Sequence, residues 1–223
     1  MIPKAEASAA LLLIALFFCS LINAAPKEKN TKEASQHGAC FVLGKNVIPK
    51  IIEINEKVTC NTKVHPFKQY PQIPDVTYDG LSYTEVDFQK DTTVSPIRFA
   101  IKSFTIKGNN SDLKVFTRLQ AVYNAMNAAI RSVGSSHDIT LKLLKGPDFF
   151  IAMLLAIVKK DLNGPEGAQH KLGKVLKNCV RCSERDIADV KAIAAKHRVK
   201  PAPETPSKAQ PKGHLNSNTG AKP

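Results

Sequence analysis

The sequence predicts an α+β fold, with strands in the first half of the ordered chain and helices in the second. Residues 66–106 contain short apolar runs, and Ile97, Phe99 and Ile101 alternate as the residues of a strand do. After Thr117 the apolar residues recur at helical spacing. Strands followed along the chain by helices are typical of the α+β class.

The first 24 residues have the features of a secretory signal peptide. Lys4 precedes an apolar run from Ala9 to Ile22, and the small residues Ala24 and Ala25 follow it. We expect cleavage after Ala24 and a secreted protein. A membrane anchor is the alternative, but the run of ~14 residues is shorter than the ~20 that a bilayer span requires. We expect no stable membrane span elsewhere, and a disordered polar leader at 25–39.

Cleavage would leave an even number of cysteines, which indicates two disulfides in a secreted chain. Three pairings are possible, and we favour the two local ones, Cys40 with Cys60 and Cys179 with Cys182. The Cys-x-x-Cys spacing also allows a redox site or a zinc site, but the expected flanking elements and further ligands are missing. We expect no metal and no cofactor.

The chain carries a formal net charge of +13, and much of the excess lies late in the sequence. Residues 141–200 contain 13 Lys and Arg against 6 Asp and Glu. Such a surface attracts nucleic acid, anionic lipid or another acidic polymer, or simply keeps the protein soluble. Asn109 opens the one N-glycosylation triplet in the sequence, which predicts an exposed loop.

The periodic segments predict individual elements. We expect a first helix at 46–59, strands at 81–88 and 97–106, a turn at 107–110, and a further strand or transition at Val115 and Phe116. Helices are expected at 119–133, from Pro147 to Val158, at 165–178 and from Ser183 onward, where Asp186 completes a weak capping box. From Pro201 the composition predicts a disordered basic tail.

Several short motifs in 40–134 resemble the guanyl-specific ribonucleases that fungi secrete. The resemblance extends to their non-catalytic relatives, the RNase-like effectors that powdery-mildew fungi secrete into plant hosts. It covers under half of the chain. It rests on Cys40, Cys60, the step Tyr70-Pro71-Gln72, the turn Thr77-Tyr78-Asp79-Gly80-Leu81, and the segments Val94-Ser95-Pro96-Ile97, Ser111–Phe116 and Ile130–Gly134.

The resemblance implies a small antiparallel sheet with one packed helix, followed here by a helical C-terminal region. It also implies a boundary near 134, with an RNase-like region at 40–134 and a helical extension at 135–200. Within 119–133, where the family has strand and loop, we follow the periodicity and expect a helix that spans about four turns.

The resemblance does not carry the ribonuclease chemistry with it. RNA cleavage needs a general base, a general acid and a cation at the phosphate. The matching positions hold Gln72, Val94 and Ser132, none of which exchanges protons near neutral pH, and Leu113 with Lys114 beside it stands where the family has its phosphate arginine. We therefore expect a protein that is not an enzyme.

These observations favour a secreted, non-catalytic binding protein, an effector that meets host RNA or protein. The residues expected to contact phosphates or stack on bases are Lys114, Tyr70, Tyr78, Arg131, Lys171, Lys174 and Lys177, with Tyr83 as a further ring.

Two other function classes stay open. One is a helical module that binds a protein partner or an anionic lipid surface, although Phe149–Val158 fits a core helix better. The other is a small secreted hydrolase that uses a histidine beside a carboxylate, such as His137 with Asp138 or His65 with Asp75.

Overall fold

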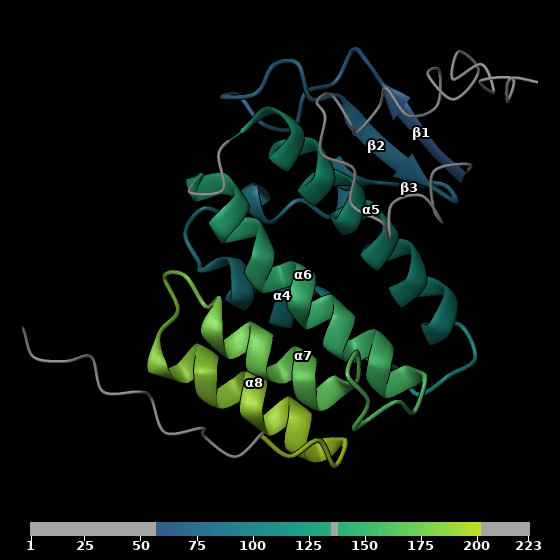
Figure 1. Ribbon diagram of the computed structural model, residues 1–223, viewed down its shortest axis with the longest axis vertical. Helices are drawn as coiled ribbons and strands as arrows, with labels where there is room; N and C mark the ends of the chain where they lie inside the picture. Colours follow the sequence, from purple (N-terminus) through teal and green to yellow (C-terminus); the bar gives the residue numbers. More distant parts are fainter. Residues whose placement is uncertain (1–56, 135–137, 202–223) are drawn as a thin grey trace, which may run out of the picture. The chain divides into compact units, whose positions relative to one another are not determined.

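The computed structural model describes residues 57–134 and 138–201. These residues form a three-stranded antiparallel sheet, five α-helices and short 3-10 turns, which confirms the α+β class (Figure 1). The segments predicted to be a signal peptide, a disordered leader and a disordered tail lie outside the described residues, as do Cys40 and His137. Within the described residues, no helix combines the length and the apolar character needed to cross a membrane.

The sheet consists of β1 (Val58–Asn61), β2 (Asp75–Tyr78) and β3 (Leu81–Ser82), in the order β1-β2-β3. Strand β1 pairs with β2 so that Val58 faces Tyr78. A two-residue turn joins β2 to β3, and its residues Asp79 and Gly80 both have positive φ, at 48° and 77°. An Asp-Gly pair suits such a turn because glycine and, to a lesser extent, aspartate tolerate the left-handed region.

The expected first helix is wrong at its C-terminal end, because Val58 and Thr59 belong to β1. Residues 46–56 of that prediction lie outside the described residues. The expected strand at 81–88 is reduced to β3, and two 3-10 turns follow it, η2 (Tyr83–Glu85) and η3 (Phe88–Lys90). Buried side chains explain this path, because Asp75 accepts hydrogen bonds from the hydroxyls of Ser82 and Thr84 and from the Thr84 N–H.

The expected strand at 97–106 is also wrong, because α4 (Pro96–Ser103) occupies it. Ser95 caps this helix by accepting a hydrogen bond from the Arg98 N–H, and Pro96 stands in its first turn. Ile97 and Ala100 are buried three residues apart on one face, as a helix requires. The Ser-Pro start is itself a helix signal, and it outweighs the alternation of three apolar residues.

Two long helices form the centre of the fold. The expected helix at 119–133 is confirmed as part of α5 (Asp112–Val133), which also includes Val115 and Phe116, so the strand expected there is wrong. Helix α6 (Ile139–Val158) begins eight residues before Pro147, which lies inside it. Gly146 allows α4 to approach α6, because a β-carbon there would lie 3.2 Å from Cγ1 of Ile97.

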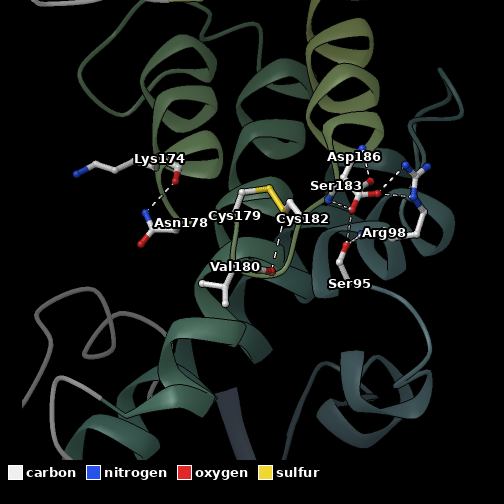
Figure 2. Close-up of a disulfide and its surroundings, with 9 residues drawn as sticks. All are labelled: Ser95, Arg98, Lys174, Asn178, Cys179, Val180, Cys182, Ser183 and Asp186. Atoms are coloured by element: carbon white, nitrogen blue, oxygen red, sulfur yellow. Dashed lines mark hydrogen bonds and ion pairs between the residues drawn. A yellow bond between two sulfur atoms is a disulfide. The ribbon is translucent and has the colours of Figure 1, made fainter. Parts of the chain in front are cut away.

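Helices α7 (Ala168–Lys177) and α8 (Glu184–Lys196) confirm the last two predicted helices. The Cys179–Cys182 disulfide, also confirmed, closes the loop between them, and Ser183 with Asp186 forms the predicted capping box (Figure 2). Asp186 also binds Arg98, so the start of α8 is joined to α4. Cys60 is disulfide-bonded as well, while Cys40, its expected partner, lies outside the described residues.

One hydrophobic core joins the sheet to the helices. Helix α5 contacts β2 and β3 along one side and α6 along another, and α6 also packs on α4 and α7 (Figure 1). The rings of Tyr83 and Tyr123 meet edge to face with centroids 5.5 Å apart, and Phe67 and Phe104 extend this aromatic group. Phe150 and Met153 of α6 are buried, which confirms that the Phe149–Val158 segment is a core helix.

Candidate functional site: a basic cleft between β2 and α5

A cleft of about 580 Å³ lies where the end of β2 meets the N-terminal half of α5. Three cationic side chains line it, and they come from two separate places: Lys57 lies before β1, and Lys114 and Arg118 lie on α5. Tyr78, the last residue of β2, supplies an aromatic ring to the same cleft. We call this set of four residues, with Asp79, the basic cleft.

The positions of these residues follow from the local structure. Lys114 and Arg118 are four residues apart in α5, so they lie on one face of the helix. The helix start is held by Asp112, whose carboxylate accepts hydrogen bonds from the backbone N–H groups of Lys107 and Gly108. A negative group at the first turn also interacts favourably with the helix dipole, which stabilises α5. The basic face of α5 is therefore fixed beside the sheet.

Asp79 is the carboxylate of the cleft, and it lies between the two α5 cations. Its Oδ2 is 3.4 Å from Nζ of Lys114 and 3.8 Å from Nε of Arg118. Lys114 is 69% exposed and Asp79 48% exposed, so water screens this contact strongly. Three cations against one exposed carboxylate leave the cleft with a positive potential that an anion can use.

Arg118 is the least mobile cation of the cleft because its stem is partly buried. The side chain is 26% exposed, and its Nε is buried without a hydrogen-bond partner among the described residues. Its Nη2 would lie 3.6 Å from a β-carbon on Gly80, so the guanidinium group packs over the hairpin turn. The β2–β3 turn and α5 thus hold this charge at a defined place.

The three tyrosines expected to stack on bases have different environments. Tyr78 is half-buried in the basic cleft. Tyr83 is fully buried and its hydroxyl donates to Asp87, so this ring packs in the core, the alternative to base stacking. Tyr70 lies elsewhere, where its hydroxyl donates to Asp138. That hydrogen bond, with burial, raises the pKa of Tyr70 to about 12.

The other predicted cations do not gather in the basic cleft. Nε of Arg131 donates to Asn127 at 2.7 Å, near the far end of α5. Lys171 forms an ion pair with Glu166, and Lys174 and Lys177 follow it along α7. Figure 2 shows the side chain of Lys174 pointing away from the disulfide loop, while its carbonyl accepts a hydrogen bond from Asn178. Of the seven predicted contact residues, the structure brings Tyr78 and Lys114 together.

Asn109, the predicted glycosylation site, is exposed in the loop before α5, as expected. Its Oδ1 accepts hydrogen bonds from the N–H and the hydroxyl of Ser111, and the next residue, Asn110, lines the basic cleft. A glycan on Asn109 would therefore stand beside the cleft.

Of the two pairs suggested for hydrolysis, His65 and Asp75 are engaged in other hydrogen bonds, and His137 of the second pair lies outside the described residues. Nδ1 of His65 lies 3.2 Å from the carbonyl oxygen of Ile73, and the carboxylate of Asp75 is occupied by Ser82 and Thr84. Asp138 caps α6 through the Leu141 N–H. In the described part of the chain, no three His, Cys, Asp or Glu side chains are grouped closely enough to hold a metal ion.

A family model described as Domain of unknown function (DUF7143) matches residues 40–198, which is more than half of the chain. The chain belongs to the DUF7143 family. The match spans the sheet, the basic cleft and all five described helices. No curated protein and no solved structure was found to match the chain. Function in this DUF7143 chain is therefore argued from its own residues.

Sequence reasoning missed Lys57, Asp79 and Arg118 as members of this site. Arg118 could have been found, because a cation four residues after Lys114 shares its face on any helix. That step required the helix to begin at Asp112, whereas a strand was expected at Val115 and Phe116. Lys57 and Asp79 are neighbours of α5 only through the pairing of β1 with β2, which the local sequence does not indicate.

Proposed function

We propose that this protein is a secreted, non-catalytic binding protein of the effector type, and that its basic cleft contacts single-stranded RNA. The observation that supports RNA most strongly is the placement of Tyr78 among three cations. Proteins that bind single strands combine a positive groove for the phosphates with aromatic rings on which bases stack. Lys57, Lys114 and Arg118 would meet phosphates, and Tyr78 would stack on a base.

The exposed residues around the cleft fit a surface that recognises rather than reacts. Leu113, 47% exposed, and Lys114 line the cleft at the position where the ribonuclease resemblance places its phosphate-binding arginine. The positions that correspond to catalytic groups hold Gln72, Val94 and Ser132. The Ser132 hydroxyl donates to the carbonyl of Ala129 within α5. These three groups supply neither an acid nor a base near neutral pH.

The test is the affinity for a fluorescent single-stranded RNA across a salt series, measured by anisotropy. The plot of log affinity against log salt concentration has a negative slope, and each phosphate contact makes that slope steeper by roughly 0.7. We expect a slope of about −2 for three cations. Lys114→Ala should weaken binding several-fold and reduce the slope by about 0.7.

Lys174→Ala is the matched control, because it removes the same charge from a lysine on α7 that does not line the cleft. We expect it to leave the slope unchanged. Equal losses of RNA affinity in the two variants would mean that binding depends on the net charge of the protein and not on the basic cleft. An affinity that ignores salt would contradict phosphate contact, and a protein partner would then be the better candidate.

The secretion part of the proposal has its own test. Mass spectrometry of the exported protein should show a chain that begins at Ala25, with four half-cystines and no free thiol. A retained protein with reduced cysteines would contradict secretion, whatever the RNA experiment shows.

A further inference from the structure

A second hollow, of about 350 Å³, lies between the middle of α5, the second half of α6 and the segment 159–171. We call it the α5–α6 pocket. Its size is at the lower end of the range of small-molecule sites. None of its lining residues lines the basic cleft, so it is a separate feature.

The inner wall of this pocket carries Asp148, a buried carboxylate that forms no ion pair with the residues the structure describes. The residue is 5% exposed. Its Oδ1 accepts a hydrogen bond of 2.6 Å from Nε2 of Gln120, and its Oδ2 accepts one of 3.1 Å from Nδ2 of Asn127. Burial raises the pKa of Asp148, while the hydrogen bonds from Gln120 and Asn127 and the charges of Lys171 and Arg131 act in the opposite direction.

Gln120, in the same wall, has a side-chain acceptor without a hydrogen-bond donor in the described structure. Its Nε2 donates both to Asp148 and to Oδ1 of Asn124, at 2.6 Å and 3.0 Å. Because an ionised carboxylate only accepts, the amide nitrogen must face Asp148. The amide oxygen Oε1 is then buried and has no hydrogen-bond partner in the described structure. The wall therefore holds one acceptor without a donor, beside a carboxylate on which Lys171 and Arg131 act without a direct ion pair.

The rest of the pocket suits the chain of a small molecule. Phe149, Ala152 and Leu155 give an apolar surface on successive turns of α6. At the rim Lys171 is already paired with Glu166. The groups that lack compensation are thus the acceptors of the inner wall, and a ligand that meets them must bring N–H donors and a positive charge.

We propose that the α5–α6 pocket binds a small organic cation, a primary ammonium or guanidinium group on a short apolar chain. The N–H groups would donate to Asp148 and to Oε1 of Gln120, and the chain would pack on Phe149 and Leu155. This inference does not depend on RNA binding at the basic cleft, because the two hollows share no residue.

The probe is butylguanidinium, titrated into the full mature chain by calorimetry and by amide chemical-shift mapping. A ligand of this size should bind with a Kd on the order of 1 mM or tighter. Butyrate and n-butanol have the same chain without the cation, and we expect each to bind at least about tenfold more weakly. Shifts should appear at residues 120–124 and 148–156.

Two variants test the named acceptors. Asp148→Asn should weaken butylguanidinium binding about tenfold to a hundredfold, and Gln120→Leu by a smaller factor. Asp87→Asn is the control: Asp87 is also a buried carboxylate, hydrogen-bonded to Tyr83 and Gln89, but it does not line this pocket. Its variant should bind as the unmodified protein does.

Three results would overturn the proposal. The first is equal affinity of Asp148→Asn and the unmodified protein. The second is binding of butyrate as tight as that of the guanidinium probe. The third needs no variant and therefore holds even if Asp148→Asn fails to fold: chemical shifts confined to residues outside 120–124 and 148–156.

Discussion

The basic cleft and the α5–α6 pocket lie along the same helix but handle charge in opposite ways. In the cleft, Lys114 and Asp79 are largely exposed, so water already satisfies them and their contact contributes little to stability. In the pocket, Asp148 is buried and depends on Gln120 and Asn127 for its hydrogen bonds. Exposed charges are available for a partner, while buried polar groups also hold the helices together.

This difference has a direct structural cause. The first turns of α5 keep an open face, on which Leu113 and Val115 are exposed. Further along, α5 runs against α6, and a polar side chain at that interface must find a partner inside the protein. The same helix can therefore present cations at one end and a buried amide–carboxylate network at the other.

The largest expected effect is on stability, and it contrasts the two carboxylates. Asp148→Ala should lower the free energy of unfolding by about 2–4 kcal/mol, because it removes the carboxylate that accepts hydrogen bonds from the buried side-chain amides of Gln120 and Asn127. Asp79→Asn should change it by less than about 1 kcal/mol, since it removes only an exposed ion pair and asparagine tolerates the positive φ of the turn. Urea denaturation of both variants measures the contrast. Similar losses would show that Asp148 is not a desolvated, structural group.

A smaller effect is expected on affinity at the cleft. Tyr78→Leu should weaken single-stranded RNA binding by about 1–3 kcal/mol, the contribution of one stacked base. Tyr78→Phe keeps the ring and should retain the affinity, so anisotropy of the two variants separates stacking from loss of bulk. If both variants bind equally, Tyr78 packs on its neighbours and does not meet a base.

The smallest effect should have the opposite sign. Asp79→Asn removes the carboxylate that competes for Lys114 and Arg118, and asparagine also tolerates the positive φ of this turn. We expect RNA affinity to increase by about 0.2–1 kcal/mol, the range of an exposed ion pair. The effect should vanish in the Lys114→Ala background if Lys114 is the cation that Asp79 holds. Weaker binding of Asp79→Asn would contradict the electrostatic account of the cleft.

The helical part of the fold was predictable because its pattern is long and local. The stripe from Leu119 to Val133 repeats over about four turns, and the Ser183–Asp186 capping box marks the start of α8 within four residues. The Cys179–Cys182 pair is likewise local, since the two cysteines are three residues apart in the sequence. Each of these features depends on residues that are close along the chain.

The sheet-bearing part was harder to predict because its path depends on distant partners. Ile97, Phe99 and Ile101 alternate, yet α4 forms there, since Ile97 packs on Gly146 and Arg98 binds Asp186. Residues 81–88 turn away from the strand path because Asp75 holds Ser82 and Thr84, and Tyr83 enters the core beside Tyr123. The Asp75 hydrogen bonds span seven and nine residues, whereas the Arg98–Asp186 and Tyr83–Tyr123 contacts join distant parts of the chain.

The sequence by itself determined the α+β class, the late helices and the positive charge, because composition and helical periodicity are properties of neighbouring residues. Only the tertiary structure decided which charges act together. It placed Lys57 and Tyr78 in one cleft with Lys114 and Arg118. It also placed Gln120 beside Asp148, although the two residues are 28 positions apart in the sequence. The physical reason is that strand pairing and helix packing, rather than local preference, set which side chains meet.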